Sequence, residues 1–171
     1  MTETCCCPSD AGSETCERRT EAQMALCPTC QQVGKRVDAL TLKALLAVPL
    51  TSLRPVEYRF CRTPTCPTVY YSVDGVQCVG EADLRERVYQ KHPADEEVFA
   101  CYCFRYKVGD VRAAVARGQA QPIIAAINAG IQAGQCACDI RNPQGSCCLG
   151  NLHAMIQASK AEMGGVSREA V

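Results

Sequence analysis

The chain has 171 residues, which suits one domain or two small ones. Its 18 basic and 18 acidic residues cancel, so we expect no general attraction to nucleic acid, and no apolar run is long enough to span a membrane. Fifteen cysteines dominate the composition, against three phenylalanines and no tryptophan. The apolar core is therefore thin, and bound metals would supply stability that it lacks.

Residues 1–24 are polar and small, and they predict a mobile tail. A first folded unit is expected over 25–97, from apolar periodicity, β-branched runs and a hairpin turn at Asp74-Gly75. The tail carries Cys5, Cys6, Cys7 and Cys16. The elements expected in the first unit are a helix over 37–46, strands over 57–60, 68–73 and 76–79, a short helix over 82–88 and a polar linker over 90–97.

A second, helical unit is expected over 98–165, followed by a short tail over 166–171. Asn142-Pro143-Gln144-Gly145 has the residue preferences of a type I turn, and it interrupts a cysteine-rich loop over 134–148. The expected helices are one from Asp110 to Gly118, one opened by Pro122, and one over 149–163 that turns Leu152, Ile156 and Met163 inward and ends at Gly164-Gly165.

The cysteine density has two common explanations, a secreted disulfide scaffold and a set of metal ligands. The N-terminus MTETCCCPSD has neither the basic nor the apolar region of a signal peptide, which predicts a cytoplasmic protein. The cysteine count is also odd, and C-x-C and C-C pairs make strained disulfides. Thiolates kept reduced for metals are the better explanation.

The first candidate metal site combines C-x2-C at Cys27 and Cys30 with C-x4-C at Cys61 and Cys66. Two such pairs, brought together by the strand ending at Phe60, would close a four-thiolate zinc site of structural type. Another metal at the same ligands and a thiol redox pair are the alternatives. A redox C-x-x-C is expected after a strand, and none is predicted before Cys27.

The second candidate site draws on six cysteines, of which four suffice for a [2Fe–2S] cluster. The predicted turn would bring Cys147 or Cys148 beside Cys136 or Cys138, at the positive end of the last helix. At least two of the six must have another role, and zinc is a rival to the cluster. The six are Cys101, Cys103, Cys136, Cys138, Cys147 and Cys148.

Over about residues 25 to 155 the chain resembles the amino-terminal domain of CopZ-type copper chaperones, and its second half resembles bacterioferritin-associated ferredoxin. The matching motifs are Cys27-Pro28-Thr29-Cys30, Phe60-Cys61-Arg62 with Cys66, Val69-Tyr70-Tyr71, Cys101-Tyr102-Cys103-Phe104 and Asn142-Pro143-Gln144-Gly145-Ser146-Cys147-Cys148.

The resemblance implies one zinc ion and one [2Fe–2S] cluster. With the predicted elements, it indicates an α+β fold in which a small zinc-bound β-hairpin and helix unit precedes a helical [2Fe–2S]-binding unit. The implied zinc ligands are Cys27, Cys30, Cys61 and Cys66. The implied cluster ligands are Cys101, Cys103, Cys138 and Cys148, with Cys136 or Cys147 as replacements that the sequence leaves open.

Two functions follow. The first is a one-electron carrier of metallochaperone type in copper or other soft-metal homeostasis, in which the tail thiols capture Cu(I) or Hg(II) and the partner is a redox protein or a metal transporter. The second is a [2Fe–2S] module that docks on a partner protein and reduces it, with incidental tail thiols. No cysteine follows Cys148, so we expect no copper domain of the family's M-x-C-x-x-C type.

An enzyme is the weakest interpretation, because no catalytic Ser/His/Asp or paired-carboxylate arrangement is legible. We expect His92 to be solvated in the linker and His153 to pack on the last helix, with tuning of the cluster as its alternative role. Cys78 is expected to be a packed strand thiol. Tyr70 and Tyr71 are expected in the strand core and at its edge.

Overall fold

The computed structural model describes residues 26–166, so the predicted tail over 1–24 and its four cysteines lie outside the described residues. Helices, strands and two 3-10 helices (η) alternate along the chain. In order they are β1 (Lys35–Val37), α2 (Ala39–Leu45), η1 (Leu50–Ser52), β2 (Tyr58–Phe60), β3 (Thr68–Ser72), β4 (Cys78–Gly80), η2 (Glu81–Asp83), β5 (Phe99–Cys101), β6 (Tyr106–Lys107), α3 (Val108–Ala116), α4 (Ala120–Gln132), α5 (Cys138–Arg141) and α6 (Leu149–Val166).

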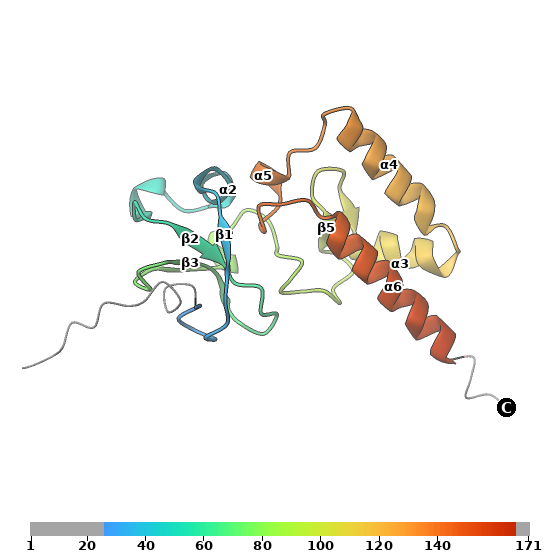
Figure 1. Ribbon diagram of the computed structural model, residues 1–171, viewed down its shortest axis with the longest axis horizontal. Helices are drawn as coiled ribbons and strands as arrows, with labels where there is room; N and C mark the ends of the chain where they lie inside the picture. Colours follow the sequence, from blue (N-terminus) through green and yellow to red (C-terminus); the bar gives the residue numbers. More distant parts are fainter. Residues whose placement is uncertain (1–25, 167–171) are drawn as a thin grey trace, which may run out of the picture.

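The fold is α+β, as predicted. The antiparallel sheet has the order β1-β2-β3-β4, and the pair β5-β6 starts a separate group with the long helices. Figure 1 shows the sheet and the helices α3, α4 and α6 at opposite ends of the molecule, with α5 between them. In the described part of the chain, every helix is too short or too polar to cross a membrane.

The central strand β3 is buried along its whole length because it is covered on both faces. Neighbouring side chains of a strand point to opposite faces. Tyr70 accordingly joins the apolar cluster beneath α2, with Leu42 and Phe60, whereas Tyr71 packs among the cysteines on the other face. The sheet therefore separates an apolar core from a layer of thiols.

The helical group has its own core, in which α3 and α6 pack against each other and against β5. Val111, Leu152 and Ile127 are among its most buried side chains. Gly130 of α4 lies so close to the Phe104 ring that a Cβ atom there would clash with it. This close approach places the end of α4 beside the Cys101–Phe104 turn.

The predicted strands and the hairpin at Asp74-Gly75 are confirmed, and Gly75 adopts the positive φ of 72° that such a turn uses. A β-turn is present at Asn142–Gly145, where a type I turn was predicted, since the Gly145 amide donates to the Asn142 carbonyl at 2.8 Å. The helices predicted after Asp110 and Pro122 correspond to α3 and α4.

Several expectations were wrong. No α-helix forms over 82–88, because Leu84 pairs with Leu46 in a β-bridge and the Glu81 carboxylate accepts the Val88 amide. The helix α6 continues through Gly164-Gly165 to Val166, and Met163 is 46% exposed and not turned inward. The predicted linker over 90–97 is a series of turns held to the body of the protein.

The sheet holds the turn of the cysteine-rich loop directly. The buried Tyr70 hydroxyl donates to the Pro143 carbonyl at 2.6 Å, and the Lys35 ammonium donates to the Gln144 carbonyl at 3.4 Å. The Gln90 and Gln144 side chains are also hydrogen-bonded. These contacts connect the sheet to the loop that ends at Cys148.

Replacing Tyr70→Phe should therefore loosen this turn. The change leaves the buried Pro143 carbonyl without its donor, at a cost of about 1–3 kcal/mol in unfolding free energy. Amide hydrogen exchange over 142–148 should accelerate. Tyr71→Phe is the matched control, because the Tyr71 hydroxyl accepts the Gly34 amide at 2.9 Å on the other face. Equal acceleration in both variants would contradict the assignment.

Candidate metal centres

Four thiols from two separate segments converge on the outer face of the sheet. The Cys27 and Cys66 sulfurs are 3.9 Å apart, the Cys30 and Cys61 sulfurs are 3.6 Å apart, and all four lie within 4.8 Å of one another. Sulfurs bound to one tetrahedral zinc ion at about 2.3 Å lie about 3.8 Å apart. The arrangement therefore has the dimensions of a closed four-thiolate site.

Tight turns place these thiols. The first pair lies on a knuckle in which the Gln31 amide donates to the Cys27 carbonyl at 2.8 Å, and Gln31 takes a φ of 58° to reverse the chain. Cys61 is fixed where β2 ends, because its amide donates to the Val69 carbonyl at 2.8 Å. The hydroxyls of Thr29 and Thr68 join the two segments at 2.7 Å.

Burial raises the pKa of Cys27, Cys61 and Cys66 above the usual thiol value. Burial acts in the same direction on Cys30, but hydrogen bonds with the Thr63 hydroxyl and neighbouring groups outweigh it and lower its pKa to about 6. At neutral pH the metal-free site thus holds one thiolate and three thiols. A bound cation must displace the remaining protons.

A second group of thiols lies between β5, α5 and the start of α6. The Cys138 sulfur is 3.5 Å from that of Cys103 and 3.4 Å from that of Cys136, and Cys103 and Cys136 are 3.9 Å apart. The buried Cys148 thiol is hydrogen-bonded to both Cys101 and Cys138. Five thiols therefore meet here.

The thiols of this second group differ in acidity. Hydrogen bonds from Cys148 lower the pKa of Cys101 to about 7 and that of Cys138 to about 5. Because it donates these bonds, Cys148 has a raised pKa. Burial raises the pKa of Cys103 to about 12 and also raises that of Cys136. Such a set of soft donors fits a thiolate-bound metal cluster.

The structure brings all eight predicted ligands into two groups, four in each, and adds Cys136 to the second. Cys147 is exposed and lies outside both groups, whereas Cys148 immediately precedes α6. Cys136 belongs to the second group because its sulfur lies close to that of Cys138. The sequence spacing alone left open whether Cys136 is a ligand. All cysteines in the described residues are free thiols.

Three other expectations need correction or refinement. Cys78 is exposed, because β4 is an edge strand and Cys78 points away from the core. His153 is an exposed residue of α6, so the prediction that it packs there is wrong. His92 is partly buried and its Nε2 atom lies 2.5 Å from a Glu81 carboxylate oxygen, so it is anchored and not merely solvated.

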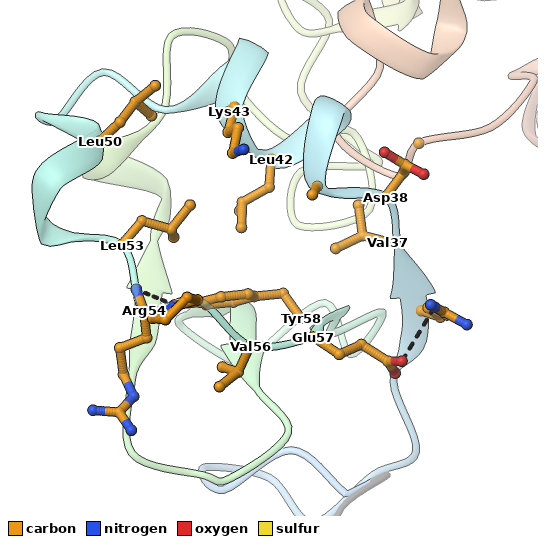
Figure 2. Close-up of a pocket in the computed structure, with 14 residues that line it drawn as sticks. Val37, Asp38, Leu42, Lys43, Leu50, Leu53, Arg54, Val56, Glu57 and Tyr58 are labelled. Atoms are coloured by element: carbon orange, nitrogen blue, oxygen red, sulfur yellow. Dashed lines mark hydrogen bonds and ion pairs between the residues drawn. The ribbon is translucent and has the colours of Figure 1, made fainter.

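One pocket on the sheet unit is separate from both thiol groups. It has a volume of about 830 Å³ and opens between β1, α2, η1 and the start of β2. Figure 2 shows Leu42, Leu53 and Tyr58 around its apolar interior. None of its lining residues is a cysteine, so the sulfur chemistry of the chain lies elsewhere.

Comparison with known proteins agrees with this geometry. Residues 24–85 match the family model zf_CopZ, a zinc binding domain. The chain is also similar to the X-ray structure of the Archaeoglobus fulgidus CopZ N-terminal domain, with 27% identity and a TM-score of 0.64 over 76% of this chain and 96% of that one. No curated protein gives a significant match.

The fold and the two thiol groups are those of a metal-binding protein, and the matched family model is a zinc binding domain. More particularly, residues 24–85, which match the zinc binding domain model, contain the four thiols with the geometry of a zinc site. The likeness to bacterioferritin-associated ferredoxin is not addressed by these comparisons and stays a prediction.

Replacing Cys61→Ser should release zinc, because Cys61 is 1% exposed and no other donor of the described chain enters the first group. Loss of a structural metal should cost about 4 kcal/mol or more in unfolding free energy. Zinc content and thermal unfolding measure both effects. Cys78→Ser is the matched control and should retain zinc; retention of zinc by Cys61→Ser would exclude Cys61 as a ligand.

Zinc affinity should also depend on pH with a predictable sign. At pH 7 the three thiols with raised pKa values must lose protons, so binding should release about three protons. Below about pH 6 the Cys30 thiol is protonated as well, and the affinity should fall more steeply. Calorimetry in buffers of different ionisation enthalpy counts the protons. Release of fewer than two at pH 7 would contradict the raised pKa values.

Proposed function

We propose that the chain is an iron–sulfur and zinc protein that transfers single electrons in copper or other soft-metal homeostasis. The observation that carries the proposal is the convergence of five thiols beside a separate four-thiol group. Zinc in the first group leaves no coordination position open, so that centre would be structural. The second group would then be the working centre.

Cys101, Cys103, Cys138 and Cys148 would hold a [2Fe–2S] cluster in this proposal. When bound, the cluster supplies reversible one-electron transfer. The surrounding chain would tune it. The Ala137 amide donates to the Cys103 sulfur at 3.3 Å. Cys148 immediately precedes α6, and its carbonyl accepts the Leu152 amide at 3.0 Å. Amide donors and a helix N-terminus both stabilise negative charge on sulfur.

The tail thiols are part of the proposal, although they lie outside the described residues. Cys5, Cys6 and Cys7 would capture a soft ion, either Cu(I) or Hg(II), because such ions prefer thiolate ligands. The partner would be a redox protein or a metal transporter.

Docking on a partner protein without metal trafficking is the second candidate. It is favoured by the position of Cys103 and Cys136, which are both partly exposed at the surface. Electron transfer to another protein requires such an accessible edge. Removing residues 1–24 separates the two functions, since only the trafficking function should lose Cu(I) affinity.

Protein purified without oxygen should contain about two iron, two sulfide and one zinc per chain and show a visible spectrum that bleaches on reduction. Cys101→Ser should abolish or strongly shift that spectrum, because Cys101 is buried at the centre. Cys147→Ser is the control and should match the wild type. Absence of iron and sulfide from the wild-type protein would refute the electron-transfer proposal and leave a zinc-binding module.

A further inference from the structure

The second centre has one thiol more than a four-ligand cluster uses. Cys136 follows the end of α4, where Gly134 takes a φ of 70° and the Gln135 amide donates to the Gly130 carbonyl at 2.9 Å. This C-terminal cap fixes the chain that delivers Cys136 to Cys138. Cys136 is therefore positioned by the fold and is not an incidental loop thiol.

Cys103, Cys136 and Cys138 form a compact triangle. Their sulfur separations are 3.4, 3.5 and 3.9 Å, and all three lie within 4.8 Å of one another. Three sulfurs bound to one ion at about 2.3 Å lie about 4.0 Å apart in a plane. The triangle thus needs only a small expansion to hold a three-coordinate ion.

The number of sulfur donors in the triangle determines which kind of metal ion it suits. Cys148 is hydrogen-bonded to Cys138, but among the described residues no fourth His, Cys, Asp or Glu lies within 4.8 Å of all three sulfurs, whereas the first centre supplies four. Zinc in closed sites takes four ligands, while soft monovalent ions such as Cu(I) are well satisfied by thiolates in lower coordination. Cys103 and Cys136 are also partly exposed, which gives an ion a route in.

We propose that Cys103, Cys136 and Cys138 form a three-thiolate site for a soft monovalent cation in the chain that lacks a cluster. Binding replaces the thiol protons of the triangle with one cation and needs no electron transfer. Because Cys103 and Cys138 also belong to the proposed cluster ligands, the ion and the cluster exclude each other. The inference rests on the proposed function only for this last point.

The test uses the full chain with Cys5, Cys6, Cys7 and Cys16 replaced by serine and zinc added to saturation. The cluster-free form is titrated anaerobically with Cu(I) against a chromophoric Cu(I) chelator. One ion should bind tightly, and Cys136→Ser should weaken it at least tenfold. Cys147→Ser should leave Cu(I) affinity unchanged, because this exposed thiol lies outside both groups.

Cluster reconstitution in Cys136→Ser and in Cys148→Ser tests which of the two thiols the cluster needs. Cys136→Ser should form the cluster with the wild-type spectrum, whereas Cys148→Ser should not. Cu(I) added first should block reconstitution in the wild-type background and not in Cys136→Ser. Zinc content and circular dichroism verify that each variant is folded.

The outcomes are separable. Equal Cu(I) affinity in Cys136→Ser and Cys147→Ser overturns the inference and leaves the cluster proposal intact. Loss of the cluster in Cys136→Ser also overturns it, because Cys136 would then be a cluster ligand. Absence of a cluster in every variant, together with weakened Cu(I) binding in Cys136→Ser alone, supports the ion site and refutes the proposed electron carrier.

Discussion

Closure of the first thiol group is the constraint on which the rest of the structure depends. The strands of the sheet have three to five residues each, too few to be stable on hydrogen bonds alone. Cys27 and Cys66 are 39 positions apart, and a metal that joins them fixes the knuckle, the end of β2 and the start of β3 at once. Tyr71 then packs against the four sulfurs, so metal binding and burial of the central strand stabilise each other.

The strand β3 also contacts the loop that positions the second centre. Tyr70 and Tyr71 are adjacent, and the alternation of a strand sends one to the sulfur layer and the other to the opposite face. From there Tyr70 reaches the Pro143 carbonyl, five positions before Cys148. Gly145 approaches Thr41 of α2 so closely that a side chain there would be crowded, which fixes the far side of the turn. A short chain of contacts therefore links the two thiol groups, and it explains how the sheet positions a long cysteine-rich loop.

The sequence predicted most strands and turns of the fold, and the predictions that were wrong have physical causes. Strands with β-branched runs, the Asp74-Gly75 hairpin and the Asn142–Gly145 turn were predictable because local residue preferences and tertiary contacts agree there. The segment over 82–88 has a helical pattern, but the pairing of Leu84 with Leu46 outweighs that local preference. The short α5 was missed because four residues show no periodicity. The first cysteine group followed from spacing, but the choice of ligands in the second rested on the resemblance. The approach of the Cys136 and Cys103 sulfurs depends on how α4 ends, which spacing does not encode.

The contrast between the two centres follows from where their donors come from. The first is built from two turns clamped to one sheet, and it offers four sulfurs of which three are buried. Metal selectivity in such sites comes from donor number and geometry more than from affinity. The second is assembled from β5, from the cap of α4, from α5 and from the start of α6, so its donors can be used in different subsets. A rigid set of four favours one permanent ion. A set of five shared among several elements leaves more than one subset of donors for a metal, and both the proposed cluster and the proposed ion site depend on this.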